Sequence, residues 1–314
     1  MGWRAGWEKE VGVTKWPESI TVRSLTWAAC ITLLVVAVAG CIPGDFGIGV
    51  IVTRGRPTAM YWTDSRPGRV RRASLDGEGA ETLVTAGLQF VDGIAVSLDF
   101  GKIYWTDTGT DKIQRANLDG SGVEDVITSG LDDPAGIALD VAHGKIYWTE
   151  FESREICRAD LDGAGVEVLV TTGAVPGPVG IALDVVRGKM YWAEAGSDKI
   201  QCANLDGSDV QDLVTAGLSI PFGIALDPIW AKIYWTDEGT SKIQRADLDG
   251  SDIEDLIAAG LDTPQGIAVD ASARKMYWVD DGTDMIQRAN LDGSDIEDLI
   301  TLDISVPWGI ALLQ

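Results

Sequence analysis

The stretch Tyr-Trp-Thr-Asp occurs first at residues 61–64 and returns, with small changes, in five later places. The six copies are Tyr61-Trp62-Thr63-Asp64, Tyr104-Trp105-Thr106-Asp107, Tyr147-Trp148-Thr149-Glu150, Tyr191-Trp192-Ala193-Glu194, Tyr234-Trp235-Thr236-Asp237 and Tyr277-Trp278-Val279-Asp280. Their tyrosines are 43, 43, 44, 43 and 43 residues apart. A fixed period between 20 and 50 residues indicates a repeat architecture. We therefore expect one structural unit to be repeated along most of the chain.

Each repeat contains four short segments rich in Ile, Val, Tyr and Trp, separated by Gly and Asp. In the third copy they cover residues 136–140, 145–148, 155–160 and 166–170. Runs of this length between turn residues predict strands rather than helices. The last two segments are joined through Asp162-Gly163, a dipeptide that suits the positive φ of a tight hairpin. Each repeat is thus predicted to be a four-stranded antiparallel meander.

Six such sheets predict an all-β fold, a six-bladed β-propeller, because a single sheet of about 43 residues must bury its faces against neighbours. The first strand of each blade contains a glycine, which would let the crowded inner strands approach one another. These glycines are Gly93, Gly136, Gly180, Gly223, Gly266 and Gly309. The tyrosines and tryptophans lie one strand further out, so we expect them in the core between blades rather than in a stacking site.

The ends of the repeat array do not match each other. Residues Gly309 to Leu313 form a first strand with no Tyr-Trp copy after it, whereas the copy at Tyr61 lacks a good first strand before it. We expect the C-terminal strand to become the innermost strand of the first blade and close the ring. The alternative is that Gly49-Val50-Ile51-Val52 takes this place.

The N-terminal part has a different composition. An apolar run from Leu25 to Ile42 follows Lys15 and Arg23, a pattern typical of a secretion signal or a membrane anchor. Its segment Val38-Ala39-Gly40-Cys41 resembles the lipobox of bacterial lipoproteins, which implies lipidation of Cys41 and a place in the cell envelope. A single-pass anchor or a secreted form stays open. We expect residues 1–41 to be a signal or anchor, 42–60 a linker and 61–314 the propeller.

The chain carries 48 acidic and 25 basic residues, a net charge of -23. This excludes nucleic acid as a partner, because binding to phosphates needs a basic face. A basic protein suits the charge better.

Cys157 and Cys202 occupy non-equivalent positions in adjacent repeats and lack CxxC spacing, so we expect neither a disulfide nor a thiol site from them.

From Tyr61 to Leu313 the sequence resembles the YWTD β-propeller, or LDL-receptor class B repeat, a family found in lipoprotein-receptor relatives, nidogen and bacterial secreted proteins. The resemblance implies a module without catalysis that binds protein on the face near the central channel. We expect the chain to be a monomer. Two features depart from it. No cysteine-rich EGF-like module is present, so the endocytic role of the animal receptors is not carried over. The motif's aspartate is Glu150 and Glu194 in two adjacent copies, which should alter its hydrogen bonds.

A single binding site needs asymmetry, so the candidate site residues are those at positions where the copies differ. The loops after the second strand, and those between blades, vary most and lie on one face of a meander ring. The predicted site residues are Asp92, Phe151, Glu152, Phe222, Gln265 and Trp308. Phe222 and Trp308 are proposed as its apolar centre, surrounded by acids; the alternative is that they only plug the channel.

The second functional class considered is a metal-assisted hydrolase or lyase, because six-bladed propellers include lactonase-like enzymes. Such chemistry usually recruits histidine, and His143 is the only one. The acids Asp140, Asp184, Asp227 and Asp270 precede turns and are expected to cap them. Calcium at turns such as Asp249 and Asp252 is weakly indicated, since the twelve-residue calcium-loop pattern is absent. We expect no catalytic residue, metal or cofactor.

Overall fold

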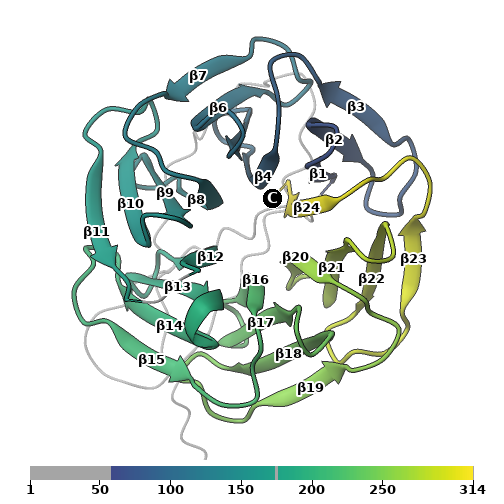
Figure 1. Cartoon of the computed structure of the whole chain (residues 1–314). Coiled ribbons are helices and arrows are strands. Elements are labelled where there is room, and N and C mark those ends of the chain that lie inside the picture. Colours follow the sequence, from purple (N-terminus) through teal and green to yellow (C-terminus); the bar gives the residue numbers. More distant parts are fainter. Residues whose placement is uncertain (1–57, 174–175, 314) are drawn as a thin grey trace, which may run out of the picture. The chain divides into compact units, whose positions relative to one another are not determined.

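Six antiparallel sheets of four strands each make up the described part of the chain, residues 58–173 and 176–313 of a computed structural model (Figure 1). The sheets are arranged radially around a central axis, with one short 3-10 helix, η1 (Ala195–Ser197). This confirms the predicted six-bladed propeller. The expected signal or anchor, Cys41 and the boundary at residues 41 and 42 lie outside the described residues.

Each blade is named here by its strands from the axis outward. Blade 1 is β24 (Pro307–Leu312), β1 (Met60–Asp64), β2 (Arg69–Ala73) and β3 (Glu81–Val84); blade 2 is β4 (Val91–Ser97), β5 (Lys102–Asp107), β6 (Lys112–Asn117) and β7 (Glu124–Ile127); blade 3 is β8 (Pro134–Asp140), β9 (Lys145–Glu150), β10 (Glu155–Asp160) and β11 (Glu167–Thr171). Blade 4 is β12 (Pro178–Asp184), β13 (Lys189–Glu194), β14 (Lys199–Asn204) and β15 (Gln211–Val214); blade 5 is β16 (Pro221–Asp227), β17 (Lys232–Asp237), β18 (Lys242–Asp247) and β19 (Glu254–Ile257); blade 6 is β20 (Pro264–Asp270), β21 (Lys275–Asp280), β22 (Met285–Asn290) and β23 (Glu297–Ile300).

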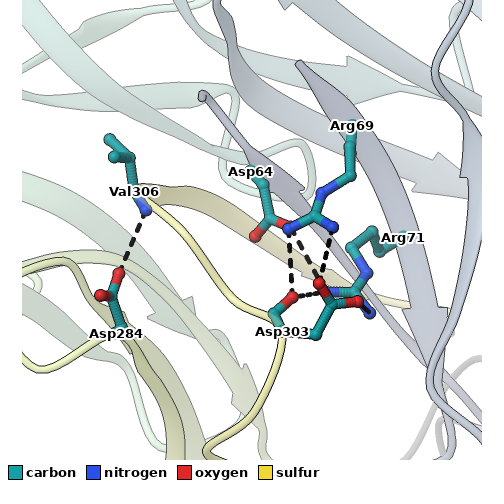
Figure 2. A network of polar contacts seen from close by, with 6 residues as sticks. All are labelled: Asp64, Arg69, Arg71, Asp284, Asp303 and Val306. Carbon is teal, nitrogen blue, oxygen red and sulfur yellow. Dashed lines mark hydrogen bonds and ion pairs between the residues drawn. The ribbon is translucent and has the colours of Figure 1, made fainter. Parts of the chain in front are cut away.

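The ring is closed by the last strand. β24 pairs antiparallel with β1, with Met60 opposite Leu312 and Trp62 opposite Ile310. It therefore occupies the innermost place that Gly49–Val52 would have taken, as expected from the unmatched ends of the repeat array. Figure 2 shows the polar contacts that hold the preceding loop, where the side chain of Asp303 binds Arg69 and Arg71 of blade 1.

The repeated aromatic residues form the core between blades. All six motif tryptophans are 0% exposed, and the tyrosines are at most 4% exposed. Each tryptophan packs with the tyrosine of a neighbouring blade, as Trp62 does with Tyr277. The prediction that these rings are core is confirmed, and they cannot meet a ligand.

The inner strands meet so closely that only glycine fits between them. A Cβ built on Gly136 would lie 2.2 Å from the carbonyl oxygen of Val179 in the next blade, and one on Gly223 would lie 2.3 Å from that of Gln265. The other four inner glycines give values between 2.3 and 2.6 Å. The cavity on the axis, lined by these glycines and their neighbouring isoleucines, has a volume of only about 60 Å³. The expected role of the glycines is confirmed, and the channel is nearly closed.

The motif threonine links each blade to the next. Thr106 Oγ1 accepts the N–H of Gly93 in its own blade at 2.8 Å and donates to the carbonyl of Ala135 in the next blade at 2.6 Å. Thr63, Thr149 and Thr236 make the same two bonds. Ala193 and Val279 hold this place in blades 4 and 6 and have no hydroxyl. The corresponding bridges to Phe222 and Trp308 are therefore missing.

Replacing Val279 with threonine should restore one bridge. The two side chains have nearly the same shape, and Val279 is fully buried at the position that Thr106 holds in blade 2. We expect Val279→Thr to raise the free energy of unfolding by about 1 kcal/mol, the net value of a buried hydrogen bond. The reverse change, Thr106→Val, should lower it by about 1–3 kcal/mol because it leaves two buried backbone groups without this partner. Urea unfolding of both variants tests the pair, and a stability loss in Val279→Thr would contradict it.

A second link between blades comes from the third strand. Arg115 in β6 donates to the carbonyl of Leu161 in the next blade at 3.1 Å, and four other blades have the same contact from Arg72, Arg158, Arg245 and Arg288. Blade 4 has Cys202 at this position. Since it also has Ala193, the boundary between blades 4 and 5 lacks both repeated links.

Candidate functional site

The predicted site residues lie on the face formed by the loops after each second strand and by the loops between blades. We call this the acidic face. Its loops hold ten acids: Asp111, Asp132, Asp133, Glu152, Asp198, Glu238, Asp262, Asp281, Asp284 and Asp303. The only basic residues in these loops are Arg66 and Arg154. Four third strands also begin at this face with a basic residue, Arg69, Lys112, Lys199 or Lys242, and Asp303 is paired with Arg69 and Arg71. Acids nevertheless outnumber basic residues, so the face is negative.

The acids are close enough to affect one another's charge. The pKa of Asp133 is raised by burial and then by the charges of Glu152, Asp111 and Asp132. The pKa of Glu238 is raised by burial and by Asp281 of the next blade. Like charges held together favour a cationic partner, which would relieve their repulsion.

Phe222 and Trp308 meet at the centre of this face. Their ring centroids are 5.0 Å apart and their planes cross at 65°, an edge-to-face arrangement. They come from β16 and β24, with β20 between them, and Trp308 also lines the axial cavity. Both residues are half-buried, so part of each remains exposed to solvent. The pair both covers the channel mouth and presents an aromatic surface.

Phe222 and Trp308 each lie in a five-residue segment, and the two segments share a pattern that was not predicted. Ser219-Ile220-Pro221-Phe222-Gly223 and Ser305-Val306-Pro307-Trp308-Gly309 share a pattern that the other blades lack. Ile220 and Val306 have φ of 57° and 53°, a conformation that β-branched residues rarely adopt. The carboxylates of Asp198 and Asp284 accept the N–H of these two residues, at 2.8 and 3.2 Å; Figure 2 shows the second contact. Comparing the six pre-glycine segments would have revealed the pattern.

Asp92 and Gln265 complete an arc with the aromatic pair. These four residues occupy the same position on β16, β20, β24 and β4, which are consecutive around the axis. Burial raises the pKa of Asp92 to about 7, although its carboxylate accepts a hydrogen bond from Ser65 Oγ at 3.1 Å. The Oε1 atom of Gln265 is buried without a hydrogen-bond partner. The arc thus combines two aromatic rings with two buried polar groups.

Phe151 and Glu152 lie apart from this arc, in the loop that follows β9 of blade 3. The N–H of Phe151 donates to the carbonyl of Asp133, and its own carbonyl accepts the N–H of Gly177. Glu152 is exposed and faces Asp133. Both residues lie on the acidic face away from the aromatic centre, and of the two only Glu152 adds charge.

The exposed apolar residues Phe90 and Ile220 also lie on this face and were not predicted. They are 41% and 40% exposed, and the guanidinium of Arg66 lies 5.1 Å from the ring of Phe90. Both come immediately before the first strand of a blade. The presence of large apolar residues in loops between blades could have identified both positions from the sequence.

The motif carboxylate has a structural role that explains its recurrence. Asp107 accepts the N–H groups of Gln89, Phe90 and Thr110, so it joins the two loops on the acidic face. The longer Glu150 reaches the N–H of Asp132 and the indole of Trp148 instead. Glu194 accepts from Thr172 Oγ1 through one oxygen, while its other oxygen has no partner. The expected change of hydrogen bonds in blades 3 and 4 is confirmed.

Glu194 should make stability depend on pH. Burial raises its pKa to about 7 from 4.5, and it lines a cavity of about 450 Å³ between blades 3 and 4. Because the folded state holds this proton more tightly than the unfolded state, the contribution of Glu194 to stability is fully present below about pH 4.5 and is lost as pH rises through about 4.5–7.

Glu194→Gln should remove this part of the pH dependence. We expect the variant to gain about 1–3 kcal/mol over the wild type on going from pH 4 to pH 8, measured by urea unfolding at both values. The exposed Glu78 serves as the control, because Glu78→Gln should show no such gain. An identical pH profile for Glu194→Gln and wild type would contradict the assignment.

The acids considered for enzymatic chemistry accept hydrogen bonds from backbone N–H groups in turns. Asp140 Oδ1 accepts the N–H of His143, whose Nδ1 lies 2.7 Å from the other carboxylate oxygen, and Asp184, Asp227 and Asp270 accept turn N–H groups in the same way. Their predicted capping role is confirmed. Asp249 holds the N–H and hydroxyl of Ser251. Within residues 58–173 and 176–313, no three His, Cys, Asp or Glu side chains are grouped to hold a metal ion.

The two cysteines of the propeller are free and buried. Burial raises the pKa of Cys157 to about 12, so this thiol is protonated at neutral pH and unreactive. The pKa of Cys202 is also raised by burial. Both side chains belong to the hydrophobic clusters between blades.

Fold and site together define a six-bladed propeller with a nearly closed channel and an acidic, aromatic-centred face. The sequence model of the low-density lipoprotein receptor repeat class B matches residues 101–141, 188–228, 231–271 and 274–312, just over half of the chain. The chain therefore belongs to this family. No curated protein matches the sequence.

Solved structures with the same fold include both binding proteins and enzymes. A chain from a crystal structure of the nidogen/laminin complex is 26% identical, with a TM-score of 0.74, over 82% of this chain and 98% of that one. A streptogramin B lyase is 18% identical with a TM-score of 0.63, over 81% and 83%. The virginiamycin B lyase from Staphylococcus aureus is 20% identical with a TM-score of 0.55, over 70% and 73%. The two lyases share the fold alone.

Proposed function

We propose that this protein is exported and binds a basic protein partner on its acidic face, with Phe222 and Trp308 as the apolar centre of contact. The observation that carries the proposal is the edge-to-face pair at 5.0 Å, placed within a face of ten loop acids and two arginines. Aromatic residues at the centre of a charged surface are typical of binding hot spots. The likeness to a chain from the nidogen/laminin complex, an assembly of two proteins, supports a protein ligand.

The geometry favours binding over catalysis. The channel cavity of about 60 Å³ is too small for most metabolites, whereas the loops around it form a broad surface suited to a macromolecule. We propose that the protein acts as a monomer without a cofactor, tethered to the envelope through Cys41 or the apolar run before it.

A metal assay of the purified protein addresses the enzymatic alternative, because one tightly bound calcium per chain would favour a metal-assisted hydrolase or lyase.

The partner should be lost when the aromatic centre is removed. We expect the full-length wild type to capture a basic protein from the envelope extract, and Phe222→Ser/Trp308→Ser to reduce its affinity at least about 100-fold, as two hot-spot residues imply. The matched control is Ile229→Ser/Trp230→Ser, which removes a similar apolar pair from the opposite face. Full binding by the Phe222→Ser/Trp308→Ser protein, with its thermal unfolding unchanged, would refute the site.

Raising the salt concentration gives a second test of the same surface. If the ten acids guide association, the association rate should fall steeply with ionic strength while the dissociation rate changes little. A salt-independent association rate would count against an acidic binding face even if the aromatic pair is required.

A further inference from the structure

The opposite face of the ring carries large apolar residues in its turns. The turns between first and second strands cover residues 98–101, 141–144, 185–188, 228–231 and 271–274, and we call this side the turn face. Val186 is 93% exposed, Ile229 68%, Trp230 61%, Leu98 55% and Phe100 51%. Tight turns are normally polar, because their residues must be solvated. Three of five turns on one face therefore break the usual pattern in the same way.

These side chains are displayed on rigid turns rather than on loose loops. Asp227 is fully buried and accepts the N–H groups of Ile229 and Trp230, which fixes the turn between β16 and β17. Asp184 holds the turn of Val186 through Arg187, whose guanidinium lies 2.6 Å from the carboxylate. These hydrogen bonds hold the two turns that carry the exposed side chains of Val186, Ile229 and Trp230.

The chain enters the propeller on this same face. In blade 1, Met60 and Leu312 pair where the other blades have a first-to-second-strand turn, so both ends of the described chain emerge there. The N–H of Thr58 donates to the carbonyl of Leu313 at 3.3 Å. The apolar run of the sequence ends at Ile42, and the 15 residues from 43 to 57 can span at most about 50 Å.

We propose that the turn face rests on the surface of a neutral lipid bilayer, with Val186, Ile229 and Trp230 inserted among the headgroups. The proposal rests on the envelope tethering proposed above. A short tether keeps the face at high local concentration near lipid, so even weak insertion suffices. Tryptophan and arginine suit this layer, where a ring meets both apolar and polar surroundings. The guanidinium of Arg274 already lies 5.6 Å from the ring of Trp230.

The charges around the turn face favour neutral lipid over the other occupants. Exposed acids of the outer hairpins surround it: Asp119, Asp162, Asp206, Asp249 and Asp292. Anionic lipid would be repelled by this rim, and a second copy of the chain would bring an identical rim against it. Neutral headgroups carry no such penalty. The acidic face would then point away from the membrane, open to its partner.

The experiment places an environment-sensitive fluorescent amino acid at position 186 of the full-length protein, reconstituted in phosphatidylcholine vesicles with nitroxide-labelled lipid. The matched control has the same amino acid at position 302, where Leu302 is 81% exposed on the acidic face. We expect at least about three-fold more quenching at 186 than at 302, as for a residue in the headgroup layer. Ile229→Asp/Trp230→Asp in the labelled protein should abolish the difference.

Equal quenching at the two positions would overturn the proposal. A blue shift at position 186 that appears in lipid-free detergent and grows with protein concentration would instead identify a second copy as the occupant. Partner capture by the acidic face does not depend on these residues, so loss of quenching with retained capture would refute only the membrane contact.

Discussion

Ending the chain at Ser305 should leave a protein that no longer unfolds cooperatively. The truncation removes β24, which supplies the innermost strand of blade 1 and buries Ile310, Leu312 and Leu313. It also exposes the edge of β1 and breaks the bond from Gly309 to Thr63. We expect a loss of about 5 kcal/mol or more, comparable with the whole stability of many domains. Circular dichroism during urea unfolding measures it.

The matched control for this truncation is removal of Gln314 alone, which follows the last described residue and should leave the urea midpoint unchanged. If the protein ending at Ser305 has the same midpoint and slope as the full chain, the ring is not closed by β24.

A methyl group on an inner glycine should be the most damaging point substitution. In Gly136→Ala the new Cβ would lie 2.2 Å from the Val179 carbonyl oxygen, and this backbone atom belongs to the next blade's inner strand. Neither strand can yield without opening the boundary between blades 3 and 4. We expect a loss of about 3 kcal/mol or more, at the upper end for overpacked cores.

The control for Gly136→Ala is the same substitution at Gly173, whose added Cβ would meet no atom within 4 Å. Differential scanning calorimetry should show an unchanged melting temperature for Gly173→Ala and a shift of many degrees for Gly136→Ala. Equal melting temperatures for the two variants would show that the inner strands have more room than the structure gives them.

Most of the fold could be predicted from the sequence because the residues needed for packing recur in all six copies of the repeat. The spacing of the tyrosines, the inner glycines and the unmatched strand at residues 309–313 were enough to predict blade number, strand order and closure. The sequence did not reveal why the motif contains threonine. Thr106 joins Gly93 to Ala135 across a blade boundary, and such a contact between segments 29 residues apart has no local pattern.

The site was only partly predictable. Differences among the copies selected residues of one face, and Asp92, Phe222, Gln265 and Trp308 lie on consecutive inner strands. That this face binds a partner stays a prediction. The direct contact of Phe222 with Trp308 depends on how two rings from alternate blades tilt over the axis, which spacing does not determine. Positions 151 and 152 differ among the copies just as strongly, yet Phe151 and Glu152 lie away from this centre. Differences among copies therefore do not identify a site by themselves, because they also arise where a position is free from packing.

The closure of blade 1 also determines when folding can finish. The bond between Gly309 and Thr63 joins residues 246 positions apart, so β1 has no inner neighbour until almost the entire chain has been synthesised. Contacts of such long range are slow to form, and an unpaired strand edge invites pairing with other chains meanwhile. We therefore expect blades 2 to 6, whose strands are each consecutive in the chain, to assemble first. Although blade 1 is the first to be synthesised, it would therefore be the last to be completed.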